Sequence, residues 1–461
     1  MGRPPPIDRV SADDLMSLVA EHGSTPMQVA AVLMLDTTNG LDPQNLIDQL
    51  GARVALVPRL RQRLVPVPVG CGRPIWVDDA GFDITRHVSV LELDHPDEEA
   101  VLRLAADRLG SPLPRDRPLW TATLVTGPGA AEAALIMVFH HVLTDGIGGL
   151  AVLGSLVDGA QPAGGTPFPR PRPTNRRIAA DMARLRLRAV AELPRGVLRL
   201  TAAVRQLRVV GHPPTSGGGN APAGPPRPAR LPRTSLNVPT GPRRRFVSIR
   251  VSLAQTLAVA RAERATVNDL LLVAIAAALR RLLEGRGERL DEFVVSVPFS
   301  AREQTTAGQL GNASGVIPLR IPATGDARSR IRRVAALTRT AKQSARGAST
   351  ALIGPLFRLL ARVGLYQRFI ERQRLIHTFT SNLRGPAEPL TLVGCPITAM
   401  LPLSAATGNV SVAFAALSYA GTLAITVVAD PDVCPDLDVV PAALAAEFTA
   451  LGIEVLRAGA G

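Results

Sequence analysis

An apolar run that ends in two histidines constrains this chain more than any other feature. Residues 134–139 are Ala-Leu-Ile-Met-Val-Phe, which predicts a buried strand, and His140 and His141 follow directly. Asp145 and Gly146 then open a glycine-rich turn into an apolar helix. Because the end of a buried strand is a usual place for chemistry, we take this stretch as the candidate active site.

The spacing of the two histidines gives them different roles. Adjacent side chains of a strand point to opposite faces, so His140 and His141 cannot serve one pocket in the same way. We expect one to be catalytic, because an imidazole can take a proton from a hydroxyl and return it to a leaving group. Asp145 can anchor the turn, and Gly146 leaves room where backbone and substrate come close. The alternative is a pair of core histidines capped by a turn aspartate.

The seven residues from His140 to Gly146 have the pattern HHxxxDG. This pattern resembles the signature of the CoA-dependent acyltransferase superfamily, which includes condensation domains, polyketide-associated acyltransferases and chloramphenicol acetyltransferases. The resemblance implies that His141, His140, Asp145 and Gly146 are the catalytic residues, with His141 as the base. The signature alone does not define the substrate.

Length and composition predict two lobes joined by a linker. With 461 residues, 46% of them hydrophobic, the chain can bury a large core and is too long for one ordinary domain. We assign residues 1–158 to an N-terminal lobe that carries the histidine motif, 159–231 to a basic linker, and 232–461 to a C-terminal lobe. The three cysteines are far apart and lack the spacing of a zinc site, which indicates free thiols in a reducing cytosol.

The formal net charge of +14 is concentrated in one segment. Residues 161–250 hold 18 arginines and two acids, whereas the rest of the chain holds 34 basic and 36 acidic residues. Aromatic residues make up 3% of the chain, and none lies among those arginines before Phe246, so stacking on nucleic acid is poorly supported. Anionic lipid, or the phosphates of an acyl carrier, fits the charge better.

Part of this basic segment is predicted to be amphipathic. From Thr174 to Val210 apolar side chains recur at helical spacing, arginines occupy the other faces, and Pro194 divides the stretch into two helices. Such helices commonly lie on membrane surfaces, but helices packed across the two lobes would show the same pattern. No apolar run is long enough to span a bilayer, and no signal pattern begins the chain. We therefore expect a cytoplasmic protein, peripheral to the inner face of the cell membrane or to lipid droplets.

Further blocks narrow the resemblance to one family. Outside about residues 159–230 they resemble, in order, the blocks of the bacterial (actinobacterial-type) wax ester synthase/diacylglycerol acyltransferase family. Gln28 departs from the histidine usual in that family, so we assign it no catalytic role. The blocks are residues 58–64 (PRLRQRL), 72–79 (GRPIWVDD), 82–87 (FDITRH), 112–120 (PLPRDRPLW), 232–245 (PRTSLNVPTGPRRR), 294–302 (VVSVPFSAR), 311–315 (GNASG), 380–386 (TSNLRGP) and 417–421 (LSYAG).

Trp120 and the start of a predicted helix near residue 266 suggest residues that shape the site. Trp120 ends the block before the histidine strand and has the size to wall an acyl tunnel, although core packing explains it equally well. Thr266 and Asp269 have the spacing of a helix capping box, which is a sufficient structural reason for both. The family carries Asn-Asp at this point, so by resemblance Asn268 hydrogen-bonds substrate.

The predicted strand over residues 294–300 is followed by further polar candidates. It ends in Ser300, with Arg302 next and Asn312 in the following block. In the superfamily an arginine at this strand end pairs with the aspartate of HHxxxDG. The resemblance therefore implies an ion pair between Arg302 and Asp145 that holds the turn of the motif.

The resemblance implies an α/β fold of two chloramphenicol-acetyltransferase-like lobes, with mixed sheets flanked by helices and an active-site tunnel between them. The implied enzyme is an acyl-CoA:alcohol O-acyltransferase, in which His141 deprotonates the alcohol, the alkoxide attacks the thioester, and the imidazolium assists loss of the CoA thiol. Diacylglycerol is the implied acceptor, and long-chain alcohols would give wax esters. Acyl-CoA is a co-substrate, and no metal or other cofactor is implied.

Two other functions remain open. An enzyme that acylates a polyketide or glycolipid alcohol from a carrier protein would share the HHxxxDG motif, but the blocks around the motif argue against it. A catalytically silent lipid-binding paralogue would keep the fold, but the intact His140, His141, Asp145 and Asn268 count against it. Acyl chain length, the preferred alcohol and the oligomeric state do not follow from the sequence.

Overall fold

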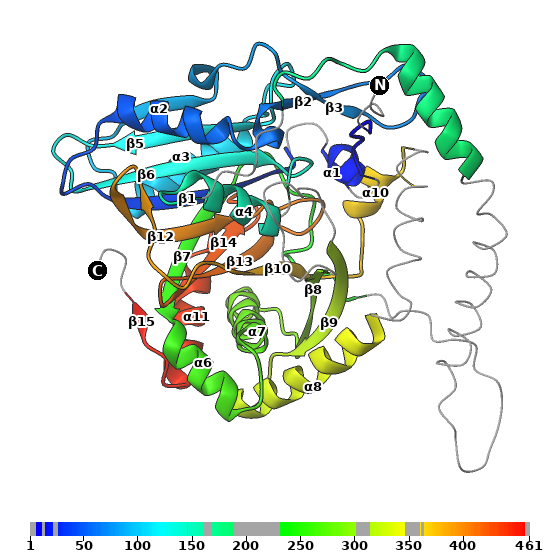
Figure 1. Cartoon of the computed structure of the whole chain (residues 1–461). Helices are drawn as coiled ribbons and strands as arrows, with labels where there is room; N and C mark the ends of the chain where they lie inside the picture. The colour runs from blue at the N-terminus through cyan, green and yellow to red at the C-terminus, as the bar shows by residue number, and fades with distance from the viewer. Residues whose placement is uncertain are drawn as a thin grey trace, which may run out of the picture.

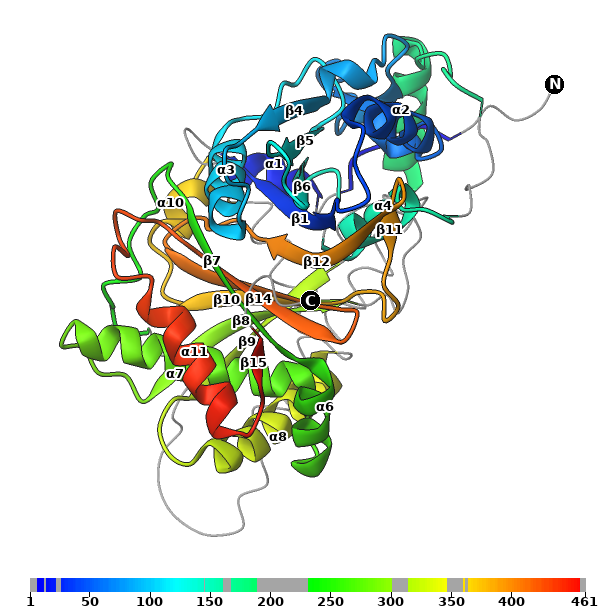
Figure 2. The same ribbon diagram turned by 90° about the vertical axis from the view of Figure 1, so that its left-hand side faces the viewer.

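The structure is a computed structural model that describes residues 6–11, 14–21, 26–144, 146–160, 167–188, 231–300, 314–345, 360 and 364–456. Within these residues two large sheets form an upper and a lower lobe (Figures 1 and 2). Parallel and antiparallel neighbours occur in both sheets, as predicted for mixed sheets.

The sheets have the following strands, given in spatial order. The six-stranded sheet consists of β11 (Thr391–Leu392), β12 (Cys395–Leu403), β1 (Gln28–Asp36), β6 (Glu132–His140), β5 (Trp120–Thr126) and β4 (Val88–Glu92). The seven-stranded sheet consists of β15 (Val455–Leu456), β7 (Arg245–Ser252), β14 (Thr422–Ala429), β13 (Val412–Tyr419), β10 (Thr378–Arg384), β8 (Glu292–Ser300) and β9 (Ser314–Pro322). A small third sheet pairs β2 (Gln62–Val65) with β3 (Ile75–Asp78).

Helices flank both sheets. The upper lobe carries α1 (Asp14–Ala20), α2 (Pro43–Val54), α3 (Glu98–Gly110) and α4 (Gly146–Leu156). The lower lobe carries α6 (Leu253–Ala262), α7 (Val267–Gly285), α8 (Ala327–Ala345) and α11 (Val439–Ala450), while the short α10 (Tyr366–Ile370) packs on α1. Helix α7 is apolar on nearly all sides because it packs against α6, α8 and α11 as well as the sheet.

The central strands β13 and β14 of the seven-stranded sheet are buried on both faces, and their sequences show why. Along β13, Val412, Phe414 and Ala416 pack in the core of the lower lobe, whereas Ala413 and Leu417 pack in the core of the upper lobe. Side chains alternate between the faces of a strand, so a strand buried on both faces needs a continuous apolar run rather than an alternating one. The apolar runs of β13 and β14 meet this requirement.

Between β10 and β13 the chain passes from the lower lobe to the upper lobe and back again. Strand β12 pairs antiparallel with β1, so residues 391–403 complete the sheet of the upper lobe. The predicted assignment of all of residues 232–461 to the C-terminal lobe is therefore corrected here. The same strand packs against β13 and β14, so the two lobes share it.

The predicted amphipathic stretch begins as a helix over residues 175–188. Ile178 packs with Ile75 and Val77 of β3, and Asp181 forms an ion pair with Arg9 at 3.0 Å. This part of the stretch therefore lies on the upper lobe, and residues 189–210 fall outside the described part of the chain. No helix among the described residues is long and apolar enough to cross a membrane.

Candidate active site

The histidine motif lies at the end of β6, between β1 and β5. The predicted buried strand is confirmed, and it ends at His140, so His141 is the first residue of the turn that follows. The backbone N–H of His141 donates to the carbonyl oxygen of Met27 at 2.8 Å, and Leu143 N–H donates to the His140 carbonyl at 2.9 Å. Backbone hydrogen bonds thus fix both histidines at the edge where the strand ends.

The His140 ring uses both of its nitrogens within the protein. Its Nδ1 accepts the backbone N–H of Val142 at 2.9 Å, so the ring proton lies on Nε2, which donates to Oε2 of Glu21 at 3.2 Å. The side chain is 2% exposed, and burial, with a smaller effect of Arg115, lowers its pKa to about 3. A ring held neutral in this way is a structural element of the motif.

His141 has a different environment. Its side chain is half-buried, and its Nδ1 lies 3.5 Å from the hydroxyl oxygen of Ser17 on α1. The predicted partner residues of the motif cannot be compared with this geometry, because Asp145, Arg302 and Asn312 fall outside the described residues. The Asp145–Arg302 ion pair therefore stays a prediction.

Gly146 begins α4 and faces the other lobe. A Cβ atom added there would lie 3.1 Å from both Cδ atoms of Leu383 in β10. Glycine thus permits a close approach between the motif and the second sheet, while the predicted approach of substrate at Gly146 stays a prediction. The motif consequently lies where the two lobes meet.

Trp120 is a core residue in this structure. It is 1% exposed, its Nε1–H donates to the Leu60 carbonyl at 2.7 Å, and its ring stacks on His87 with centroids 4.5 Å apart. The His87 ring in turn donates from Nδ1 to the Trp120 carbonyl at 2.8 Å. Burial lowers the pKa of His87, which keeps this stacked pair uncharged. These contacts give Trp120 a role in core packing, and its predicted place in the wall of an acyl tunnel stays a prediction.

The capping box at the start of α7 is confirmed. The Asp269 carboxylate accepts the backbone N–H and the hydroxyl of Thr266, each at 2.8 Å, and its other oxygen accepts the Thr338 hydroxyl at 2.8 Å. Asp269 is 2% exposed, so these contacts account for it structurally. Asn268 is half-buried beside it, and its predicted contact with substrate stays a prediction. Ser300 ends β8, opposite Ser314 of β9, which fixes only its backbone position.

Three neighbours of the motif were not assigned a role from the sequence. Gln28 lies opposite His140 in the register of β1 and β6, and its amide donates to the carbonyls of Leu109 and Ser111 at 2.8 and 2.9 Å. The other two are Glu21 and Ser17. They are four residues apart, a spacing that places two side chains on one face of a helix, and this was the available signal.

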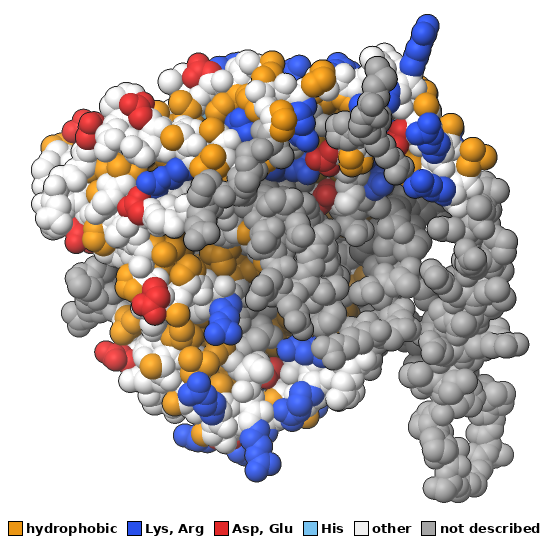
Figure 3. Space-filling model, viewed as in Figure 1, with side chains coloured by type: hydrophobic (Ala, Val, Ile, Leu, Met, Phe, Trp, Pro, Cys, Tyr) orange, Lys and Arg blue, Asp and Glu red, His pale blue; other side chains and the backbone are white. Residues whose placement is uncertain are grey.

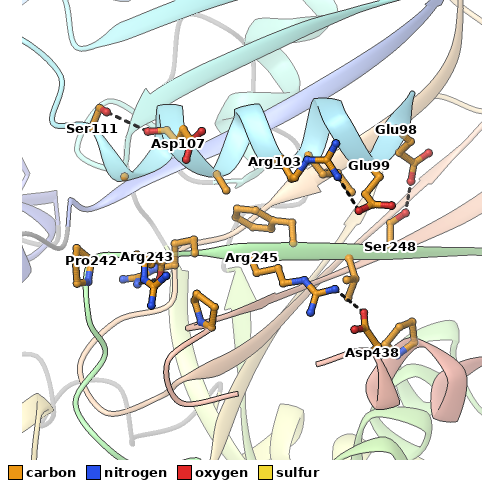
Figure 4. Close-up of a pocket in the computed structure, with 18 residues that line it drawn as sticks. Glu98, Glu99, Arg103, Asp107, Ser111, Pro242, Arg243, Arg245, Ser248 and Asp438 are labelled. Carbon is orange, nitrogen blue, oxygen red and sulfur yellow. Dashed lines mark hydrogen bonds and ion pairs between the residues drawn. The ribbon is translucent and has the colours of Figure 1, made fainter. Parts of the chain in front are cut away.

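A cavity of about 910 Å³ opens between α3 and β7, and its lining includes no residue of the histidine motif. Figure 4 shows its charged side chains, of which Arg103 pairs with Glu99 and Arg245 with Asp438, each at 2.7 Å. Glu98 accepts a hydrogen bond from Ser248 across the lobes. Because the lining neutralises much of its own charge, we do not assign the substrates to this cavity.

No group of three His, Cys, Asp or Glu side chains in the described ranges is placed to hold a metal ion. The prediction that no metal takes part stays a prediction.

Comparison with known proteins identifies relatives over most of the chain. The wax ester synthase/diacylglycerol acyltransferase catalytic domain matches residues 10–271, and the C-terminal domain of the same family matches residues 310–452. The probable diacylglycerol O-acyltransferase tgs1 of Mycobacterium tuberculosis is 29% identical over 411 residues, which cover 86% of this chain and 85% of that protein. Another M. tuberculosis protein named as a diacylglycerol O-acyltransferase is 28% identical over 459 residues, covering 94% and 87%.

Solved structures confirm the predicted fold. The wax ester synthase/diacylglycerol acyltransferase of Marinobacter aquaeolei VT8 superposes with a TM-score of 0.67 at 22% identity, covering 97% of this chain and all of that one. The starter condensation domain of rhizomide synthetase gives a TM-score of 0.61 at 16% identity, covering 96% and 93%. Since the two family models match well over half of its residues, this chain belongs to the wax ester synthase/diacylglycerol acyltransferase family and is an acyltransferase.

Proposed function

We propose that this enzyme transfers a long-chain acyl group from acyl-CoA to the hydroxyl of diacylglycerol, forming triacylglycerol, and that long-chain alcohols are further acceptors. The observation that carries the proposal is the HHxxxDG motif at the seam of two lobes whose sequence matches both parts of the family. The relatives named as diacylglycerol O-acyltransferases support the choice of acceptor.

We assign the general base to His141. The geometry around His140 supports this choice, since both nitrogens of that ring are engaged and burial lowers its pKa to about 3. A base that must gain and lose a proton near neutral pH cannot be held neutral in this way. His141 directly follows the strand, is half-buried and has its Nδ1 3.5 Å from the Ser17 hydroxyl oxygen, so it is the imidazole to which we assign proton transfer.

Acyl transfer then needs one proton to travel through His141. The imidazole takes the proton of the acceptor hydroxyl as its oxygen attacks the thioester carbonyl. The tetrahedral intermediate collapses, the carbon–sulfur bond breaks, and the imidazolium returns the proton to the CoA thiolate. Backbone amides or the Asn268 amide would stabilise the oxyanion, which is the usual role of fixed donors in such a site.

The test uses purified full-length protein and labelled palmitoyl-CoA with three acceptor conditions. Diacylglycerol, hexadecanol and a no-acceptor control are compared, and the lipid products are resolved by chromatography. Labelled triacylglycerol from the diacylglycerol reaction is expected. Labelled product only with a glycolipid or polyketide alcohol, or no transfer to any alcohol, would contradict the proposal.

We also propose that the enzyme attaches to anionic membrane or lipid-droplet surfaces through its basic segment. Leu185 and Leu187 on the described helix are 38% and 70% exposed, and they alternate with the exposed Arg184, Arg186 and Arg188. Figure 3 shows basic side chains at the upper right, over this helix. Exposed apolar side chains between arginines suit a headgroup boundary, where each arginine adds about 1 kcal/mol at low salt.

Vesicle co-sedimentation tests this attachment. Binding is expected to rise with the fraction of phosphatidylglycerol in phosphatidylcholine vesicles and to fall at high salt. Replacing Leu185 and Leu187 together by serine should weaken binding, whereas Leu337→Ser on α8, which is also 38% exposed, serves as the matched control. Equal binding to neutral and anionic vesicles would contradict the electrostatic account.

A further inference from the structure

Helix α1 and the residue that directly follows it present two polar side chains to the two histidines of the motif. Ser17 and Glu21 are four residues apart, so they lie on the same face, one helical turn from each other. The Ser17 hydroxyl lies 3.5 Å from Nδ1 of His141, and Oε2 of Glu21 accepts from Nε2 of His140 at 3.2 Å. Helix α1 and its C-terminal neighbour Glu21 thus contact both imidazoles.

The orientation of the His140 ring is coupled to the turn that carries His141. Nδ1 of His140 accepts the Val142 N–H at 2.9 Å, and the His140 carbonyl accepts the Leu143 N–H at 2.9 Å. Rotation of the ring would leave the buried Val142 N–H without its acceptor, at a cost comparable to that of a lost hydrogen bond. A group that fixes the ring therefore also fixes the turn.

Glu21 is the side chain that fixes the ring from its other nitrogen. Its side chain is 14% exposed, and Arg115 from the loop before β5 also binds its carboxylate. The Arg115 side chain is 56% exposed, so its pairing with Glu21 is a surface interaction of the kind that contributes little to stability. The hydrogen bond to His140, with a ring 2% exposed, is the buried one of the two.

We propose that Glu21 is a positioning residue for acyl transfer: through the Nε2–H of His140 it holds the turn on which His141 sits, with Ser17 facing the His141 ring. Glu21 touches neither substrate nor the reacting atoms in this proposal. The inference rests on the proposed role of His141 as the base.

Three variants separate this role from simple helix anchoring. Glu21→Ala removes the acceptor for Nε2–H, Glu21→Gln keeps an acceptor oxygen at the same place, and Arg115→Ala removes only the surface partner. Small displacements of a catalytic group cost up to about 100-fold in rate. We therefore expect Glu21→Ala to lower kcat at least about tenfold with KM within about twofold of wild type. Glu21→Gln should restore most of kcat, and Arg115→Ala should behave like wild type.

The contrary outcomes are distinct. If Arg115→Ala loses as much kcat as Glu21→Ala, the surface ion pair is what matters and the proposal is overturned. If Glu21→Gln is as slow as Glu21→Ala, the charge of Glu21 acts rather than its hydrogen bond, which also overturns the proposal. An unchanged kcat in Glu21→Ala would also overturn the proposal.

A second readout needs no turnover and keeps the inference separate from the proposed function. The rate at which diethyl pyrocarbonate modifies His141 is measured by peptide mass mapping in each folded variant. Glu21→Ala should change this rate at least threefold, while Glu21→Gln and Arg115→Ala should match wild type. If wild type shows no acyl transfer, the proposed function fails but this measurement still decides whether Glu21 positions His141. An unchanged modification rate would refute the positioning role.

Discussion

His140 and His141 are neighbours in sequence, yet their surroundings make them chemically different. The first is 2% exposed, accepts a backbone N–H and donates to Glu21, whereas the second follows the strand and is half-buried. Burial favours the neutral form of the first imidazole because water no longer solvates its charge. The same residue type therefore serves as a structural element at one position and is the proposed base at the next.

Asn268 and Asp269 offer a second contrast at this scale. Asp269→Ala removes the acceptor of the Thr266 N–H and of two hydroxyl groups, one of them on the buried Thr338, so it should destabilise the fold by about 2 kcal/mol. Asn268→Ala should leave the melting temperature within about 2 °C of wild type but lower kcat at least tenfold, because the amide would stabilise the oxyanion. Thermal scans and initial rates on both variants check this. A stable Asn268→Ala variant with full activity would exclude the amide from the site.

The sequence could predict these residues only in part. The capping box, the two histidines and the glycine of the motif follow from local spacing, and the structure has Thr266, His140 and Gly146 where that spacing indicates. Trp120 could not be classified, because a large aromatic at a strand start suits a tunnel wall and a core equally well. Glu21 was missed because its partner lies 119 residues away in the chain.

Between elements, the contact of α4 with β10 limits what can occupy the start of the motif helix. In Gly146→Ala the new methyl group would lie 3.1 Å from the Leu383 side chain, which must then shift. We expect a loss of about 1 kcal/mol in stability and a lower kcat, since the motif would move away from the second lobe. When Leu383 is also replaced by alanine, Gly146→Ala should lower the free energy of unfolding by at least 0.5 kcal/mol less than it does alone. Fully additive effects of the two changes on stability would contradict this contact.

The lobes are also tied through α3 and β7. Glu98 on α3 binds Ser248 and Arg250 on β7, and the side chains of Glu98 and Arg250 are each 13% exposed. Glu98→Gln should therefore lower the free energy of unfolding by about 2 kcal/mol. This lies between the losses expected when an exposed ion pair and a fully buried ion pair are broken. Glu99→Gln is the matched control, because its pair with Arg103 is 79% and 66% exposed. Equal melting temperatures of the two variants would show that the contact of Glu98 with β7 does not stabilise the fold.

The crossing of β12 shows which elements the sequence leaves open. Residues 395–403 form an apolar run typical of any buried strand, so their existence as a strand is predictable. Their partner is β1, more than 350 residues earlier, and no local pattern specifies that pairing. Element type therefore follows from side-chain periodicity, while sheet membership depends on contacts between distant segments.

At the scale of the whole molecule, buried histidines make stability depend on pH. Burial lowers the pKa of His140 to about 3 and that of His377 to about 4, and it also lowers the pKa of His87. In the unfolded chain these groups bind protons below pH about 6.5, while the folded protein still excludes them. The free energy of unfolding should therefore be highest above pH 6.5 and should fall as the pH drops toward 4.5.

Thermal scans from pH 7.5 to 4.5 check this dependence. Each buried histidine contributes a slope of up to about 1.4 kcal/mol per pH unit in this range. In His377→Asn the amide oxygen can replace Nδ1 as acceptor of the Val294 N–H. This variant should therefore take up about one proton fewer on unfolding, and its free energy of unfolding should depend less steeply on pH. A melting temperature that does not change between pH 7 and 5 would contradict the assignment of these residues as neutral.

The central claim is that His141 takes the proton of the alcohol during acyl transfer, and initial rates test it most directly. Triacylglycerol formation from labelled palmitoyl-CoA and diacylglycerol is compared for wild type, His141→Ala and His140→Asn, with circular dichroism as the check of folding. We predict that His141→Ala lowers kcat at least about 100-fold while it stays folded, and that His140→Asn, which keeps an acceptor for the Val142 N–H, remains substantially more active. Near wild-type turnover by His141→Ala together with an inactive but folded His140→Asn would contradict the account.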